Sequence, residues 1–398
     1  MNENPSPGFK PPEFKRDEDG RIIVTYSALT MFRSCRRKYW WRYIQQLVPA
    51  HIPITDARPF GTGIHGALEL LVHNPTEPAG LADFLREFFT PDKSHDHFVQ
   101  FMRASAMVAG YRMAWHREGS QADLAWEPIA TEQAFQGDIV DPRTGRVSEA
   151  FVMEGKADGI VRVTKPSLWG TQAIDPGVYL IEHKTASRVD ASYMAKLWCD
   201  DQIILYSHHL GEALDEPIAG VLYNVIQKTK LDHRQAETDL AFTQRKAAAL
   251  AAAQAGEGGR RLRIRKDEPE EAFKARRVAK GLEEVGALVP IEAEPAEDYA
   301  RRLASVYTKP GQFFRSALAL DPRMVKDVRE QVWEATIQHD EAMKREQWGK
   351  NKTTCWNFGK PCDFWEICTS FESPLVIEEK YRIREAHNEV NETEAKPF

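Results

Sequence analysis

The sequence predicts a mixed α/β fold, because its middle part changes from helical to strand periodicity and then back. Three stretches within residues 126–183 have strand patterns separated by Gly, Pro and Asp turns, namely 129–135, 150–163 and 178–183. A helical pattern follows over residues 190–210, and residues 218–227 return to a strand pattern. This order of strands, helix and strand indicates one mixed sheet with helices beside it.

The region before the predicted sheet is expected to be helical. Ser27 is suited to cap a short helix rich in aromatic side chains. Residues 59–63 contain Pro and Gly and are expected to form a turn. Residues 64–72 then have a helical pattern, which places His65 and Glu69 on one helix face.

Two further helical regions are expected as insertions into the α/β core. Residues 81–118 have helical periodicity, and residues 240–309 are basic and rich in Ala, Arg and Glu. Near the C-terminus, residues 321–346 carry apolar side chains at near-helical spacing and predict one long helix.

The composition favours a cytoplasmic protein that does not enter a membrane. The 398 residues are 42% hydrophobic and 28% charged, and no apolar run approaches the width of a bilayer. Residues 1–20 are polar and proline-rich and lack the apolar stretch of a signal peptide, so they are expected to be a disordered lead-in. We expect one domain over residues 21–386 and a disordered tail over 387–398.

Two carboxylates and one lysine are placed at the ends of predicted strands. Asp158 belongs to the first strand end, and Glu182 and Lys184 belong to the second, where alternation sends both to one face and His183 to the other. Two carboxylates can hold Mg2+ or Mn2+, while an ammonium group can position a water molecule beside it. The pattern favours phosphodiester hydrolysis; the alternative is a set of ordinary surface salt bridges.

Two flanking motifs strengthen the first interpretation. Residues 61–69 read Gly-Thr-Gly-Ile-His-Gly-Ala-Leu-Glu, and Gln202 and Tyr206 share one face of a later helix. From Tyr26 to Cys368, this ordered set resembles the RecB-like branch of the PD-(D/E)XK nucleases, which includes the RecB and AddB nuclease domains, CRISPR-adaptation nucleases and phage exonucleases. The resemblance implies a restriction-endonuclease-like core, a mixed sheet flanked by helices.

The resemblance also implies a role for each matched residue. The implied metal ligands are His65, Asp158 and Glu182, and we expect the backbone carbonyl of His183 to join them. Lys184 matches the catalytic lysine of the family, and Gln202 and Tyr206 match a pair that supports the site and contacts DNA. Glu132 occupies the position of an additional acidic residue often found in the preceding strand.

The sequence departs from the family pattern in two ways. It has Glu182-His-Lys where Asp-Tyr-Lys is commoner, and either carboxylate can bind the cation. It also has no Gly-x-x-x-x-Gly-Lys-Ser/Thr phosphate loop. We therefore expect a stand-alone nuclease, a homo-oligomer, or a subunit that works with a helicase, a recombinase or a single-strand-binding protein.

Four of the five cysteines are suited to bind a cofactor. Cys355, Cys362 and Cys368 are clustered near the C-terminus, and Cys35 stands near the N-terminus. Paired zinc knuckles are absent, so the spacing favours a four-thiolate iron-sulfur cluster; the alternative is four small buried side chains. Cys199 has no partner motif and is expected in the core.

The resemblance sharpens the cysteine assignment. Iron-sulfur members of the RecB-like branch have one cysteine before the histidine motif and three after the Gln-x-x-x-Tyr helix. The same layout here implies a 4Fe-4S cluster that joins the N- and C-terminal parts of the chain as a clasp over residues 355–368. We expect this clasp to be structural, because it closes a very long loop.

Charge distribution is compatible with a DNA-binding protein, although the net charge of -6 counts mildly against it. Positive charge is concentrated in one short run, Arg260, Arg261, Arg263, Arg265 and Lys266, which is either a phosphate contact or a solvated loop. Residues 36–42 mix basic and aromatic side chains; we expect the aromatics to pack inward and the basic groups to be candidate phosphate contacts.

Three classes of function differ in how well they account for these motifs. A metal-dependent DNA nuclease, acting on single-stranded or free-ended DNA in recombination, repair or phage DNA processing, accounts for the full set of motifs. A catalytically silent DNA-binding subunit would be free to lose Asp158, Glu182 or Lys184, and all three are present. A redox protein is disfavoured, because no flavin or dinucleotide motif accompanies the cysteines.

Overall fold

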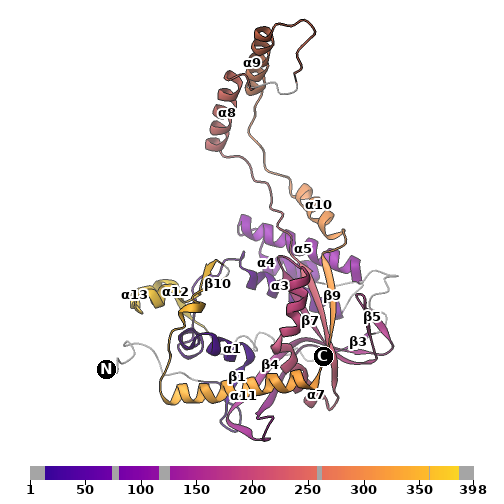
Figure 1. The fold of residues 1–398 in the computed structure, drawn as a ribbon, viewed down its shortest axis with the longest axis vertical. Coiled ribbons are helices and arrows are strands. Elements are labelled where there is room, and N and C mark those ends of the chain that lie inside the picture. The colour runs from indigo at the N-terminus through magenta and orange to yellow at the C-terminus, as the bar shows by residue number, and fades with distance from the viewer. Residues whose placement is uncertain (1–13, 74–79, 116–125, 258–261, 358, 385–398) are drawn as a thin grey trace. The chain divides into compact units, whose positions relative to one another are not determined.

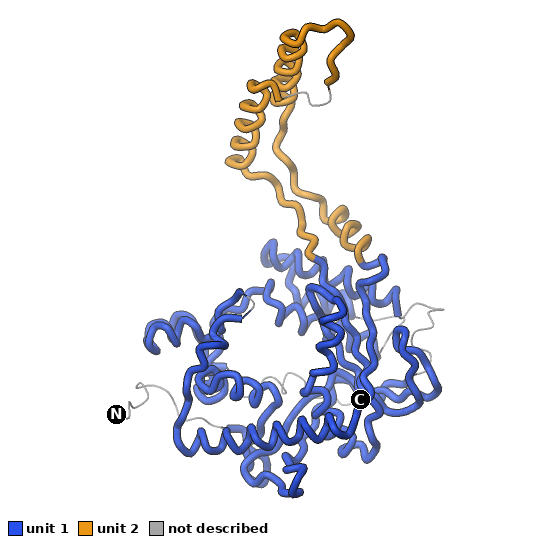
Figure 2. The backbone as a smooth tube through the Cα atoms, viewed as in Figure 1, with its two compact units in different colours: residues 1–229, 307–398 blue, residues 230–306 orange. Residues whose placement is uncertain are grey.

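The computed structural model describes residues 14–73, 80–115, 126–257, 262–357 and 359–384. Two compact units make up the chain: residues 1–229 with 307–398, and residues 230–306 (Figure 2). In the described residues, no helix has the length and apolar character that crossing a membrane requires.

A six-stranded mixed sheet forms the centre of the first unit (Figure 1). Its strands run in the order β1-β4-β7-β8-β9, with β3 also paired to β4. Their bounds are β1 Ile22–Thr25, β3 Trp126–Val140, β4 Val147–Val163, β7 Gly177–Ala186, β8 Ile218–Gln227 and β9 Phe313–Ala319. The predicted mixed α/β fold, with a sheet flanked by helices, is therefore confirmed.

The pairing of the strands explains why β7 reads as a continuous apolar run. It pairs antiparallel with β4 and parallel with β8, and both of its faces are covered. Val178 and Leu180 pack on one face, whereas Tyr179 and Ile181 pack on the other. A strand buried on both faces has no polar alternation to display.

Helices cover the face that carries Val178 and Leu180. Side chains from α1 (Tyr26–Ser34), α7 (Asp201–Leu214) and α11 (Pro322–Lys344) belong to the same apolar cluster as that face. The small hairpin of β5 (Ser167–Trp169) and β6 (Gln172–Ile174) contributes to the cluster on the other face.

The predicted turn at residues 59–63 is wrong, because α3 spans Ala57–His73 without a break. Pro59 lies in the first helical turn. Backbone N–H groups in that turn have no acceptor within the helix, so proline, which lacks the N–H group, loses no hydrogen bond there. The glycines allow a close approach of α4 (Leu81–Phe89): a Cβ atom on Gly63 would lie 2.8 Å from Phe88, and one on Gly66 would lie 2.6 Å from Phe84. Helix packing therefore overrides the turn signal.

Other helix boundaries also differ from the prediction. Thr25, not Ser27, caps α1, since the Thr25 side chain accepts a hydrogen bond from the backbone N–H of Ala28. The expected helix over residues 190–210 is divided into α6 (Ala191–Lys196), a 3-10 turn (Leu197–Cys199) and α7. In the expected 81–118 region, α4 is followed by α5 (His95–Trp115), and residues 116–118 lie outside the described residues.

Segments from the N-terminal and C-terminal parts of the described residues pair in the first unit. β12 (Tyr381–Ile383) pairs antiparallel with β2 (Leu47–Pro49). Around them lie short elements from both ends: α2 Arg36–Tyr39, a π-helix Trp40–Ile44, a 3-10 turn Lys352–Thr354, β10 Trp356–Asn357, β11 Lys360–Pro361, α12 Trp365–Thr369 and α13 Pro374–Lys380. As predicted, the aromatic side chains of Tyr39, Trp40 and Trp41 are buried.

The second unit is helical. It contains α8 (Asp239–Gln254), α9 (Glu270–Gly286) and all but the last residue of α10 (Ala296–Tyr307). α8 packs along α9, as expected for helices joined by a loop. Within the basic run, Arg263, Arg265 and Lys266 are exposed, and Arg260 and Arg261 lie outside the described residues.

Candidate active site

Strand register brings Asp158 and Glu182 together. The β4–β7 pairing ends where Gly159 is opposite Ile181, and the next residues of the two strands are Asp158 and Glu182. The backbone N–H of His183 donates a 2.8 Å hydrogen bond to Oδ2 of Asp158. Both carboxyl side chains are largely buried, with 16% and 10% of their surfaces exposed. Two acidic groups therefore converge although they are 24 positions apart in sequence.

Helix α3 supplies an imidazole to this pair. Nδ1 of His65 lies 3.3 Å from Oδ1 of Asp158. The His65 ring also meets the His183 ring edge-on, with centroids 6.1 Å apart. The close packing of α3 on α4 at Gly63 and Gly66 fixes the helix that carries His65.

Lys184 lies between two carboxylates. Its Nζ is 2.6 Å from Oε1 of Glu182 and 3.0 Å from Oδ2 of Asp200. The Glu182 contact agrees with the predicted alternation, which puts both residues on one face. Asp200 was not predicted from the sequence; the available signal was an Asp, a common N-cap residue, next to the Gln-x-x-x-Tyr motif.

The His183 side chain points away from Lys184, as alternation predicts. Its Nδ1 lies 3.4 Å from Nδ2 of Asn224 on β8, and that amide donates to the hydroxyl of Tyr111 on α5. The backbone N–H of His183 therefore faces Asp158, whereas its ring lies near Asn224 and the His65 ring.

Gln202 and Tyr206 interact on α7. Nε2 of Gln202 donates a 3.0 Å hydrogen bond to the Tyr206 hydroxyl. The Tyr206 ring packs edge-on against Phe135, and a Cβ atom on Gly155 of β4 would lie 2.7 Å from it. Tyr206 therefore packs α7 against β4, the strand that carries Asp158.

Glu132 lies beside the same group. The register pairs Thr131 with Gly159 and Gln133 with Ala157, which puts Glu132 opposite Asp158. Its carboxylate pairs with Lys156. Its backbone has φ of 48°, a conformation that is uncommon for a residue other than glycine.

The charges in this group shift one another. Burial and the neighbouring Asp158 raise the pKa of Glu182 to about 8, despite the ammonium of Lys184. Burial lowers the pKa of His65, but Asp158, Glu182 and Glu132 outweigh it and raise that pKa to about 9. The pKa of Asp158 falls well below its ordinary value, because the effects of His65 and His183 exceed that of burial. Ionising both buried carboxyl groups is therefore unfavourable, and a bound cation would favour the ionised form of both.

Comparison with known families identifies the superfamily of this chain. The model of the PD-(D/E)XK nuclease superfamily matches residues 23–369. The chain belongs to the PD-(D/E)XK nuclease superfamily. No curated protein matches the sequence. Membership implies a metal-dependent nuclease that hydrolyses phosphodiester bonds, with DNA as the implied substrate.

The donor groups of this superfamily member suit the metals that such nucleases use. Asp158 and Glu182 offer hard carboxylate oxygens, and His65 offers an imidazole nitrogen, each within the same converging group. Oxygen-rich donor sets of this kind favour Mg2+ or Mn2+. The geometry does not test the individual assignments, which stay predictions.

Three of the four cysteines predicted to be cluster ligands, Cys35, Cys355 and Cys362, are linked through short contacts. The backbone N–H of Asn351 donates to Sγ of Cys35 at 3.4 Å, and Sγ of Cys355 lies 3.7 Å from the Asn351 carbonyl. The backbone N–H of Cys362 donates to the Cys355 carbonyl at 2.8 Å. Burial raises the pKa of both Cys362 and Cys368, and each also feels the charge of Cys35. We call Cys35 together with residues 355–368 the cysteine clasp.

The remaining cysteine differs from the prediction. Cys199 was expected in the core, but it is exposed. It belongs to the 3-10 turn that interrupts the expected helix, so its direction does not follow the apolar face of α7.

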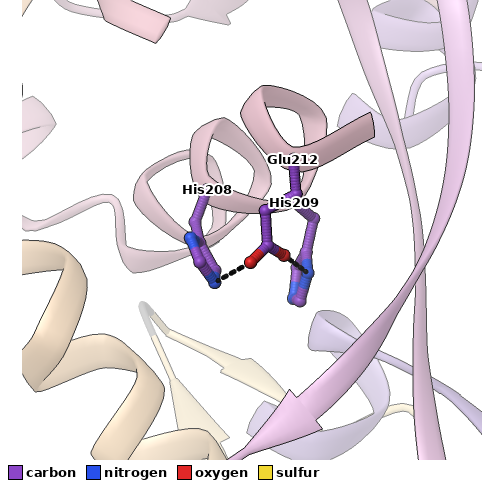
Figure 3. Close-up of side chains that lie close together, drawn as sticks. All are labelled: His208, His209 and Glu212. Carbon is purple, nitrogen blue, oxygen red and sulfur yellow. Dashed lines mark ion pairs between the residues drawn. The ribbon is translucent and has the colours of Figure 1, made fainter. Parts of the chain in front are cut away.

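A second group of potential ligands lies on α7 (Figure 3). Nε2 of His208 is 3.5 Å from Oε1 of Glu212, and Nδ1 of His209 is 3.8 Å from Oε2 of the same carboxylate. Burial and the charge of Arg329 lower the pKa of both imidazoles, that of His209 to about 4. A neighbouring guanidinium opposes binding of a cation, so this group carries no metal assignment.

Proposed function

We propose that this superfamily member is a RecB-like DNA nuclease that acts on single-stranded or free-ended DNA, most simply as an exonuclease. One observation carries the proposal: His65, Asp158, Glu182 and Lys184 converge from three elements, and Lys184 pairs with Asp200 directly before the helix that carries Gln202 and Tyr206. The resemblance to the RecB-like branch rests on that histidine and on the Gln-x-x-x-Tyr helix, and both motifs are present here. Recombination, repair or phage DNA processing is the proposed setting.

In the proposed mechanism, the strand-end residues position the reacting groups. His65, Asp158, Glu182 and the backbone carbonyl of His183 would hold one or two Mg2+ or Mn2+ ions. A bound ion would stabilise negative charge on the scissile phosphate and on the leaving oxygen. Lys184 would orient the attacking water, because its ammonium lies beside a proposed metal ligand and is only partly exposed. Gln202 and Tyr206 would support the site and contact DNA.

We propose further that the cysteine clasp holds a 4Fe-4S cluster with a structural role. Four thiols from the two ends of the chain and the backbone N–H groups directed at Cys35 and Cys362 support this assignment. Aromatic side chains cover the region, including Phe32, Tyr39 and Phe364. The proposed location is the cytoplasm, where free thiols persist and such a cluster is protected.

Degradation of end-labelled single-stranded and double-stranded DNA tests the proposal. Anaerobically purified protein is assayed with Mg2+ or Mn2+, beside Lys184→Ala and a control, Lys165→Ala, which changes an exposed lysine. Metal-dependent cutting that Lys184→Ala loses and Lys165→Ala keeps supports the nuclease, and the fate of the label gives its polarity. DNA binding without cutting, in protein that retains its iron, would favour a silent binding subunit instead.

A further inference from the structure

The position of Asp200 at the junction before α7 is unusual for its residue type. Its backbone carbonyl accepts hydrogen bonds from the N–H groups of Ile203 and Ile204, so the residue stands where an N-cap normally does. Asp at an N-cap usually accepts a hydrogen bond from its own helix, yet the Asp200 side chain makes no capping bond. The carboxylate is directed instead to Lys184.

Lys184 therefore contacts two carboxylates that differ in their proposed roles. Glu182 is 2.6 Å away but is also a proposed metal ligand. Asp200, at 3.0 Å, comes from another element and has no proposed metal role. An ammonium held only by Glu182 would depend on a carboxylate that the cation also attracts. The second contact gives the ammonium an independent anchor.

The junction does not need the Asp200 carboxylate to keep its shape. The hydroxyl of Tyr223 on β8 donates a 3.1 Å hydrogen bond to the carbonyl of Leu197, which ties the 3-10 turn to the sheet. The N–H of Asp200 bonds to the same carbonyl at 3.3 Å. Removing the negative charge of Asp200 should therefore leave the turn in place.

We propose that Asp200 is a positioning residue for catalysis: it holds the ammonium of Lys184 toward the scissile phosphate and links that lysine to the helix carrying Gln202 and Tyr206. This inference rests on the proposed nuclease function, because it assigns Asp200 to the same site. The role is distinct from that of a surface ion pair, since 20% of the Asp200 side chain and 28% of the Lys184 side chain are exposed.

Three variants test the proposal in the full-length protein. Asp200→Asn keeps the shape of the side chain and removes its charge, Asp200→Glu restores the charge on a longer side chain, and Asp201→Asn is the matched control on the adjacent residue. Asp201 feels Arg33 and bonds to Tyr26, so its carboxylate serves a different contact.

Steady-state cutting of end-labelled single-stranded DNA with Mn2+ gives the first readout. We expect Asp200→Asn to lower kcat by about 10- to 100-fold with little change in KM, the signature of a misplaced catalytic group. Asp200→Glu should recover part of the loss, and Asp201→Asn should remain within about twofold of the original protein. Wild-type kcat in Asp200→Asn, or equal losses in both Asn variants, would overturn the proposal.

A second readout does not require activity. The rate at which an amine-reactive acylating reagent modifies Lys184, followed by peptide mass spectrometry, should rise several-fold in Asp200→Asn and stay unchanged in Asp201→Asn. An unchanged labelling rate in Asp200→Asn overturns the anchor. If the original protein cuts no DNA, the proposed function fails, and the labelling rate still decides whether Asp200 holds Lys184.

Discussion

The strand-end site, made of His65, Asp158, Glu182, Lys184 and Asp200, differs from the cysteine clasp in how its groups are held. In the strand-end site, three residues belong to long strands whose register is fixed by pairing on both sides. In the clasp, the cysteines belong to or adjoin a short helix, a 3-10 turn and strands of two residues. Strand pairing positions the strand-end site, whereas the cysteine clasp depends on local contacts and on the cross-link proposed for it.

The two regions are therefore expected to contribute to different properties: the strand-end site to activity, and the clasp to stability. The strand-end site buries Asp158 and Glu182 near each other, which raises the pKa of Glu182, so the pair is costly to the fold and suited to binding a cation. The clasp joins segments more than 300 residues apart, so a cross-link there restrains the unfolded chain. Changes in the first region should affect activity without loss of stability, and changes in the second should affect stability.

The largest expected effect comes from Glu182→Gln. The substitution removes a proposed metal ligand and an acidic neighbour of Lys184, so we expect cutting to fall by at least about 1000-fold. Because the pKa of Glu182 is raised to about 8 by burial and by Asp158, the neutral amide should not lower the melting temperature. DNA degradation and thermal melting of the same preparation check both parts. A large fall in melting temperature would mean that the carboxylate stabilises the fold.

The next effect concerns the clasp. Cys362→Ala removes one proposed cluster ligand and should lower the free energy of unfolding by about 2 to 5 kcal/mol, by analogy with other cross-links that close long loops. Solubility and DNA binding should decline together. Melting temperature, iron content and DNA affinity are measured beside Cys199→Ala, whose thiol is exposed and outside the clasp. An unchanged melting temperature in iron-free Cys362→Ala would exclude a structural cluster.

The same contrast explains how much could be predicted from the sequence. Strand alternation has a period of two, so the shared face of Glu182 and Lys184 could be predicted from their spacing. The strands β1 and β9 were not predicted, since four and seven residues give little pattern until a neighbouring strand pairs with them. Pairing between distant segments is decided by tertiary packing.

The errors in the candidate region have the same physical origin. Pro59 and the glycines that follow it indicate a turn locally, but close packing against α4 keeps them helical. A continuous helix was expected through Cys199 and Asp200, but a 3-10 turn breaks it and aims the Asp200 carboxylate at Lys184. Local propensity carries no information about Lys184, which is 16 residues earlier in sequence.

The smallest expected effect concerns a buried histidine between the central sheet and the aromatic side chains beside the clasp. His339 of α11 is fully buried among Phe32, Tyr39 and Phe151, so it touches both the aromatic cluster beside the clasp and the central sheet. Burial lowers its pKa to about 4. The folded state therefore binds this proton less readily than the unfolded state, in which the pKa is about 6.5. Stability should be full above that value and fall as the pH drops through it toward 4.

His339→Leu isolates this contribution. Between pH 8 and pH 5, the single histidine should cost about 2 kcal/mol of unfolding free energy, and the Leu variant should lack that part of the decline. Denaturant unfolding at both pH values measures it, with His51→Leu as a control at an exposed position. Equal pH dependence in the original protein and in His339→Leu would contradict the assignment. A reduced dependence would locate an acid-sensitive contact between the sheet and those aromatic side chains. The Glu182→Gln variant should leave that contact intact.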